Sequence, residues 1–236
     1  MSYKKIAFFV EGYTEQEFVK KLLLAIFDEK KIAIDIRKIK GGNKVPISHT
    51  VLQSETPTDD TFYYILIYDC GGDANVKSYV LDQRESLLSA GYLKVIGLRD
   101  VYPQFSRDDI FKLKQMANYG VPQKGLLVKF VLAVMEVESW FLAEENHFLK
   151  IDAVLDEPYL KANFNLEPSR DNTELKDKPA NFLDSIYQSV GTSYEKQKAS
   201  IDRTIDALDY VNIYFNVRER NSSLNELISE FEEVLS

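Results

Sequence analysis

The chain has 236 residues, enough to bury a full hydrophobic core, and its 45% hydrophobic and 28% charged residues are ordinary for a globular protein. Its net charge of −8 argues against a protein that coats nucleic acid by bulk electrostatics, but not against an enzyme that meets phosphate through a metal ion. No apolar run approaches the roughly 20 residues that span a bilayer, no signal peptide is recognisable, and Cys70 is the only cysteine. We therefore expect a cytoplasmic protein without an intramolecular disulfide or a membrane association.

The first part of the chain alternates between strand-like and helix-like segments. Apolar or alternating runs predict strands at residues 5–10, 32–39, 62–68, 93–98 and 126–134. Helical periodicity predicts helices at residues 14–26, 75–90, 106–117 and 135–145, with a weak helical pattern at 47–53. This alternation predicts an α/β fold in which helices cover both faces of a mostly parallel sheet.

The pattern changes after residue 145. Residues 151–178 are rich in Asp, Glu, Pro and Asn, which predicts an irregular connection, and helices are predicted at 179–190, at 194–214 and from 223 onwards. We therefore expect an α/β domain at residues 1–145 and a mainly helical extension at 146–236 that packs on it. The apolar stripe of the last helix could serve this packing or an oligomer interface.

Carboxylates follow the predicted strands. They are Glu11 after the first strand, Asp69 and Asp73 after the third, Asp100 after the fourth, and Glu136 and Glu138 after the fifth. Because the carboxyl ends of parallel strands share one edge of a sheet, these acids are candidate metal ligands. Oxygen donors suit Mg²⁺ or Mn²⁺ better than zinc, and such ions support phosphodiester cleavage. Each acid alone could instead be a turn former or a helix cap.

A resemblance to a known family begins at residues 9–16, which read FVEGYTEQ. This segment resembles the opening VEGxTE motif of Toprim domains, as found in overcoming-lysogenization-defect nucleases and related bacterial families. The resemblance implies a Toprim-like, Rossmann-like fold in which Glu11 is the catalytic glutamate and Asp69 is a catalytic, metal-binding aspartate. Gly71 stands where these families have a second aspartate, so that ligand must come from Asp73 or Asp100, or be absent.

A second segment, MEVESWFLA at residues 135–143, resembles the ExExWLLA segment of Toprim-like families that are often encoded beside ABC-type ATPases. The resemblance implies that Glu136 or Glu138 adds a metal ligand or orders a basic group. It also implies an ABC-type ATPase as a partner subunit and a role as the effector of a bacterial anti-phage defence system.

Basic residues near the metal would hold the phosphates of a nucleic-acid substrate. The candidates are Lys44, Arg99, Lys178 and Arg218, together with Lys40 and Arg220. Solvated surface charge or an ion pair is the alternative for each of them.

Two functions of different classes follow. The first is a Mg²⁺- or Mn²⁺-dependent nuclease that cleaves DNA or RNA. The second is a catalytically inactive Toprim-like module that binds a partner protein or nucleic acid, an alternative that Gly71 favours. A phosphotransfer or nucleotide-hydrolysing enzyme at the same metal site is a third.

Overall fold

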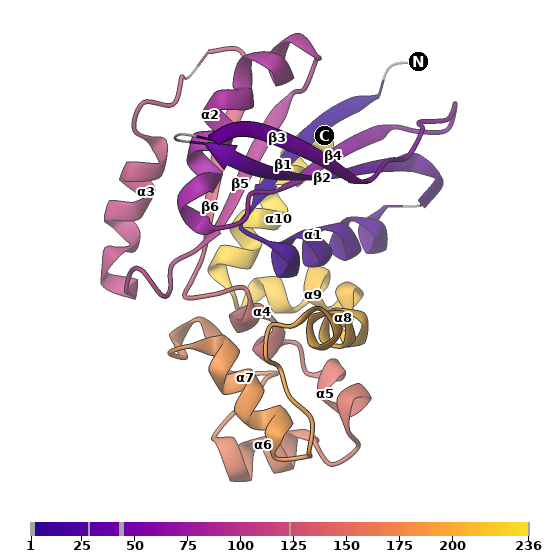
Figure 1. Ribbon diagram of the computed structural model, residues 1–236. Coiled ribbons are helices and arrows are strands. Elements are labelled where there is room, and N and C mark those ends of the chain that lie inside the picture. The colour runs from indigo at the N-terminus through magenta and orange to yellow at the C-terminus, as the bar shows by residue number, and fades with distance from the viewer. Residues whose placement is uncertain (1–2, 28, 43–44, 123, 236) are drawn as a thin grey trace. The chain divides into compact units, whose positions relative to one another are not determined.

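The computed structural model describes residues 3–27, 29–42, 45–122 and 124–235, which form one six-stranded sheet and ten α-helices (Figure 1). The strands are β1 (Lys4–Val10), β2 (Ile32–Gly42), β3 (Val45–Gln53), β4 (Tyr63–Asp69), β5 (Lys94–Asp100) and β6 (Leu127–Ala133). The helices are α1 (Tyr13–Ile26), α2 (Asp73–Ser89), α3 (Ile110–Asn118), α4 (Glu138–Ala143), α5 (Asn146–Ile151), α6 (Glu157–Phe164), α7 (Pro179–Gln188), α8 (Lys198–Ala207), α9 (Tyr210–Phe215) and α10 (Ser222–Leu235). Among these residues, no helix combines the length and hydrophobicity needed to cross a bilayer.

The strand order is β3-β2-β4-β1-β5-β6. β1 pairs in parallel with both β4 and β5, and β2 pairs in parallel with β4, whereas β3 runs antiparallel to β2. The predicted α/β fold with a mostly parallel sheet is therefore confirmed.

The central strands are mainly apolar, as expected of strands that are buried on both faces. On one face, Ala7 and Phe9 of β1 share a buried cluster with Val76 and Val80 of α2. Successive side chains of a strand point to opposite faces, so the fully buried Phe8 belongs to the other face. α1, which contacts β4, supplies buried apolar side chains from the other helix layer.

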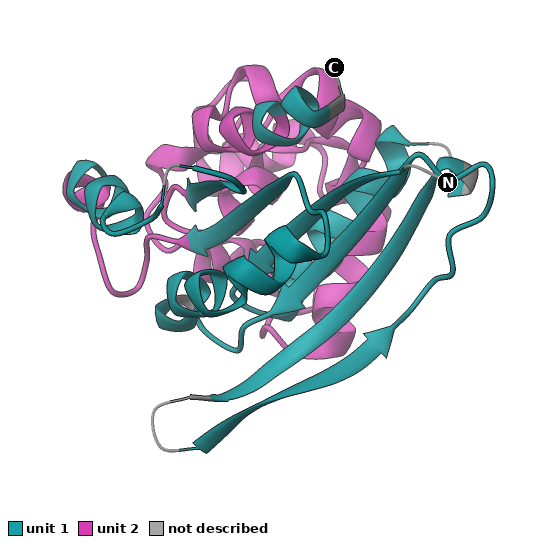
Figure 2. Cartoon of the chain, turned by 90° about the horizontal axis from the view of Figure 1, so that it is seen from above, with its two compact units in different colours: residues 1–99, 111–132, 229–236 teal, residues 100–110, 133–228 magenta. Residues whose placement is uncertain are grey.

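The segment predicted as a weak helix at 47–53 is instead the edge strand β3. Pairing with β2 overrides the weak local helical pattern. β2 and β3 form a long hairpin: β2 pairs with β4 as far as Lys38 opposite Asp69, and then continues to Gly42 (Figure 2). Gly41 (φ 106°) is required there, because a Cβ atom would collide with the carbonyl group of Pro46.

The chain divides into two compact units (Figure 2). Unit 1 consists of residues 1–99, 111–132 and 229–236, and unit 2 consists of residues 100–110 and 133–228. Each unit therefore combines segments that are distant in sequence. The sequence-based division between residues 145 and 146 stays a prediction.

The last turns of α10 belong to unit 1 and contact its sheet. The side chain of Lys94 on β5 is only 1% exposed, and its ammonium lies 2.6 Å from Glu230 and 2.7 Å from Glu233. Lys4 of β1 donates a 2.7 Å hydrogen bond to the carbonyl oxygen of Val234. The buried ammonium of Lys94 thus joins the sheet to the end of α10.

Unit 2 is helical, and it contains two further differences from expectation. The region predicted as irregular includes α6, which begins after the capping side chain of Asp156 and ends at Asn165 in a left-handed conformation. The single helix predicted at 194–214 is divided into α8 and α9 at Leu208, whose backbone leaves the helical region. Asp209 then caps α9 by accepting from the backbone N–H of Asn212.

A buried carboxylate joins the helices of unit 2. Glu144 is fully buried, and its Oε1 accepts hydrogen bonds from the N–H of Asn146 and the Nδ2 of Asn212. Its Oε2 accepts from the N–H groups of His147 and Asp209. Burial raises the pKa of this carboxyl, but the hydrogen bonds, first of all from His147, outweigh burial and hold the pKa below its ordinary value.

We expect Glu144→Gln to lower the free energy of unfolding by about 2–4 kcal/mol, because the new amide NH₂ faces N–H donors. The folded-state pKa is lower than the ordinary value of 4.5, so the stabilisation is complete above 4.5 and disappears as the pH falls through the folded value. Urea unfolding at pH 7 and at several lower pH values measures this. The exposed Glu219→Gln is the control, and a difference between Glu144→Gln and wild type that does not shrink in acid would contradict the prediction.

Candidate metal centre

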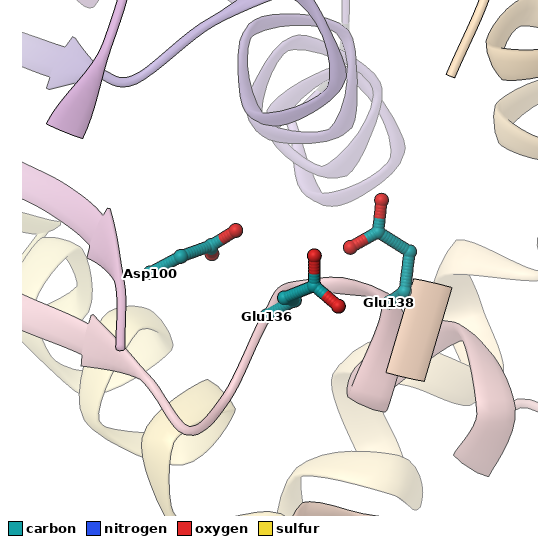
Figure 3. Close-up of side chains that lie close together, drawn as sticks. All are labelled: Asp100, Glu136 and Glu138. Atoms are coloured by element: carbon teal, nitrogen blue, oxygen red, sulfur yellow. The ribbon is translucent and has the colours of Figure 1, made fainter. Parts of the chain in front are cut away.

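Three carboxylates gather in unit 2. One oxygen from each of Asp100, Glu136 and Glu138 lies within 4.8 Å of the others, and all three residues are buried. Figure 3 shows the carboxyl groups turned toward a common space. The sequence placed these acids after two different strands, and the fold brings them together.

A tight connection after β6 positions these side chains. The N–H of Val101, just after Asp100, lies 3.2 Å from the carbonyl oxygen of Ala133 and 3.1 Å from that of Met135. The N–H of Val137 donates a 3.2 Å hydrogen bond to Oδ1 of Asp100. Met135 adopts a left-handed conformation with φ 66°, which costs a residue with a side chain about 1–2 kcal/mol. Such strain is common where a backbone must aim functional side chains.

Hydrogen bonds fix the two glutamates. Oε2 of Glu136 accepts from the N–H of Ala180 in the first turn of α7, at 3.1 Å. Oε1 of Glu138 accepts from the hydroxyl of Tyr194 at 2.8 Å. The ammonium of Lys196 lies 2.9 Å from Oε1 of Glu136 and 3.2 Å from Oε1 of Glu138. The loop between α7 and α8 therefore brings a hydroxyl and a cation to the cluster.

The charges of the cluster shift one another's pKa values. Burial raises the pKa of Glu138; the charge of Lys196 opposes this shift, and that of Glu136 adds to it. Although burial disfavours the charged form of Lys196, the carboxylates, first of all Glu138, raise the pKa of its ammonium. Oε2 of the fully buried Glu138 has no hydrogen-bond partner among the residues that the structure describes. A buried oxygen of this kind normally has a donor, a water or a cation as its partner.

This donor set fits a hard divalent cation. All three ligand candidates offer carboxylate oxygens, which Mg²⁺ and Mn²⁺ prefer, whereas a zinc site usually includes nitrogen or sulfur. A cation would also give the unpartnered oxygen of Glu138 a partner. Asp100, Glu136 and Glu138 are thus the residues that could hold a metal.

Glu11 and Asp69 lie together in unit 1. Glu11 directly follows β1, and Asp69 is the last residue of the neighbouring strand β4, where it lies opposite Val10 of β1. The N–H of Gly72 donates a 2.7 Å hydrogen bond to the carbonyl oxygen of Glu11, which ties the two strand ends together. This is the adjacency that the sequence predicted for these two residues.

The carboxylate of Asp69 is already engaged. Its Oδ2 lies 2.6 Å from the ammonium of Lys38, and its Oδ1 accepts a 2.9 Å hydrogen bond from the N–H of Gly71. A metal ion at Asp69 would share this carboxylate with Lys38 or displace it. The metal-binding role of Asp69 stays a prediction.

The other candidate residues are dispersed. α2 begins at Asp73, but the side chain of Asp73 and the whole of Lys44 lie outside the described residues. Arg99 is a half-buried residue of β5 in unit 1, and Lys178 is an exposed residue of unit 2 that directly precedes α7.

Arg218 and Arg220 both have local contacts in unit 2. Nε of Arg218 donates a 2.8 Å hydrogen bond to Asn225, and its guanidinium lies 5.3 Å from the ring centre of Tyr214. Arg220 donates a 3.0 Å hydrogen bond to the carbonyl oxygen of Ala143. These contacts give both side chains structural roles; phosphate binding by Arg218 stays a prediction.

The sequence did not identify Lys196 or Tyr194 as site residues. The predicted helix at 194–214 included both residues, but α8 begins only at Lys198, and they lie in the loop before it, where helical spacing does not indicate which way a side chain points. The resemblance at residues 135–143 implied that a glutamate orders a basic group, but it did not say which one.

We expect Lys196→Met to destabilise the metal-free protein by about 1–2 kcal/mol. This is less than for a fully buried pair because 41% of the Lys196 side chain is exposed. Mg²⁺ should raise the Tm of this variant more than that of the wild type, because the cation replaces the lost positive charge. Thermal unfolding with and without EDTA measures both effects.

Lys178→Met is a matched control, because Lys178 (φ 48°) shares the left-handed backbone of Lys196 (φ 51°) and loses the same charge. Equal effects of Mg²⁺ on the Tm of both variants would contradict the prediction that the cation takes over the charge of Lys196.

The chain was also compared with known proteins. We found no match to a protein-family model, to a curated protein or to a solved structure.

Proposed function

We propose that this protein is a Mg²⁺- or Mn²⁺-dependent phosphodiesterase that cleaves nucleic acid, with Asp100, Glu136 and Glu138 as the cation ligands. The supporting observation is the gathering of three buried carboxylates within 4.8 Å, one of them with an unpartnered oxygen. Burying like charges in this way is costly, and cation binding is the use that best accounts for it.

When bound, a divalent cation polarises a phosphate oxygen and lowers the pKa of coordinated water. The protein contributes the orientation of the ligands. Ala180 and Lys196 fix the two oxygens of Glu136, and Tyr194 fixes Glu138, so the carboxylates need little rearrangement. The partly exposed ammonium of Lys196 lies where the buried acids meet solvent, and it can donate to a phosphate oxygen of the substrate.

Glu11 is the proposed general acid or base, on the strength of the Toprim-like motif. It is half-buried at the end of β1, beside Asp69 on the neighbouring strand. The resemblance of residues 135–143 to families encoded beside ABC-type ATPases supports a wider proposal. The protein would be a cytoplasmic effector of an anti-phage system, controlled by an ATPase partner.

A second candidate is a Toprim-like module that binds a partner protein or nucleic acid without cleaving it. Two observations at Asp69 favour it. Lys38 and the N–H of Gly71 engage both carboxylate oxygens of Asp69, and Gly71 replaces the second aspartate of the motif.

The proposed activity can be tested with purified protein on plasmid DNA, single-stranded DNA and transfer RNA, in Mg²⁺ or Mn²⁺. We expect cleavage that EDTA abolishes. Glu138→Gln should reduce it by about 10–100-fold, the usual loss when the support of a metal site is damaged, or by more. Calorimetry should show weaker Mg²⁺ binding by the same variant, because one charged ligand is lost.

Glu219→Gln, an exposed change in the same unit, is the control and should behave as the wild type. Cleavage that persists in Glu138→Gln would exclude the proposed ligand set, and cleavage that persists in Glu11→Gln would exclude Glu11 as acid or base. Absence of both cleavage and Mg²⁺ binding would favour the non-catalytic module.

A further inference from the structure

Unit 1 contains a pocket of about 390 Å³ that the proposed chemistry does not use. It lies at the carboxyl ends of β2 and β4, and its lining includes Lys38, Lys40, Gly71, Asn75 and Tyr79. Its volume is in the usual range of small-molecule sites.

The topology of the sheet opens a crevice at this point. From β2 the chain turns outward to the edge strand β3, whereas from β4 it passes through α2 to β5, on the far side of β1. The two connections diverge, and ligands of open α/β sheets bind where such connections separate beyond the strand ends.

The pocket combines a free cation with an accessible backbone. Lys38 neutralises Asp69, but Lys40 is exposed and forms no ion pair with the residues that the structure describes. Gly71 has φ 66°, and a Cβ atom there would meet nothing within 4 Å, so a ligand can approach its backbone closely.

The walls of the pocket are fixed from within the unit. The hydroxyl of Tyr79 donates a 2.8 Å hydrogen bond to the carbonyl oxygen of Gly41, and Nδ2 of Asn75 donates a 3.2 Å bond to that of Cys70. α2 begins at this pocket, and the N-terminus of a 17-residue helix carries partial positive charge.

The adjoining hairpin adds no negative charge beside the pocket. Residues 36–53 include no acidic residue, in a chain whose net charge is −8. Arg37 pairs with Asp35 and Lys38 with Asp69, so Lys40 is the cation without an ion pair in the described part of the hairpin. The hairpin continues past the end of β4, so it offers more length than one phosphate group needs. A polymer of phosphates suits this arrangement better than a single nucleotide.

We propose that this pocket binds a backbone phosphate of a nucleic-acid strand, with Lys40 as its principal cation and the β2–β3 hairpin following the strand beyond it. The identity of the ligand as nucleic acid rests on the proposed function; the phosphate chemistry follows from the pocket.

The test is fluorescence anisotropy with labelled single-stranded DNA and RNA of about twelve nucleotides, in EDTA so that nothing is cleaved. Lys40→Gln should weaken binding about five- to tenfold and reduce the slope of log K against log[salt] by about 1. Gly71→Asn, which places a side chain in the pocket at a backbone conformation that asparagine tolerates, should weaken binding without a change of charge. The exposed Lys112→Gln is the control for charge loss and should bind as the wild type.

Wild-type affinity in both Lys40→Gln and Gly71→Asn, with thermal unfolding confirming that they fold, would overturn the proposal. If a nucleoside monophosphate or inorganic phosphate displaces the labelled strand as strongly as unlabelled oligonucleotide does, the pocket binds a free phosphate ligand and the proposal of a nucleic-acid strand is wrong. Failure of the nuclease proposal is distinct: oligonucleotide would bind through Lys40, yet no metal would support cleavage.

Discussion

Mutual repulsion among Asp100, Glu136 and Glu138 is the constraint on which the centre of unit 2 depends. Carboxylates this close and this buried cannot all stay charged without compensation. Part of this compensation comes from the N–H group of Ala180 at the start of α7, the hydroxyl of Tyr194 and the ammonium of Lys196. The placement of these helices and of their connecting loop is thus tied to the electrostatics of the three acids.

Much of the fold could be predicted, because the central strands are buried on both faces and read as apolar runs. β1 and β4 are such strands, and each lies close to its predicted position. β3 could not be recognised in this way, because nearly all of its side chains are exposed and only its pairing with β2 makes it a strand. α6 was missed because its stability depends on end caps and on the buried Leu160, with little periodicity.

The candidate site was predictable only in part. Acids at strand ends could be identified from position, and Asp100, Glu136 and Glu138 do meet. The sequence could not show that Asp69 pairs with Lys38 or that Lys196 contacts the glutamates. The partners are far apart in sequence, and only the tertiary structure brings them together. The Toprim-like identity and the roles of Glu11 and Asp69 stay predictions.

The ion pair between Lys94 and α10 has a consequence for the order of folding during synthesis. Lys94 and Glu233 are 139 positions apart, and the whole of unit 2 lies between them in sequence. While the ribosome is still synthesising the intervening residues, Lys94 of β5 has not yet met Glu230 and Glu233, the carboxylates that it pairs with in the folded protein. Contacts between residues so far apart in sequence form late. We therefore expect that unit 1, whose first residues are synthesised first, completes its folding only after α10 has been made.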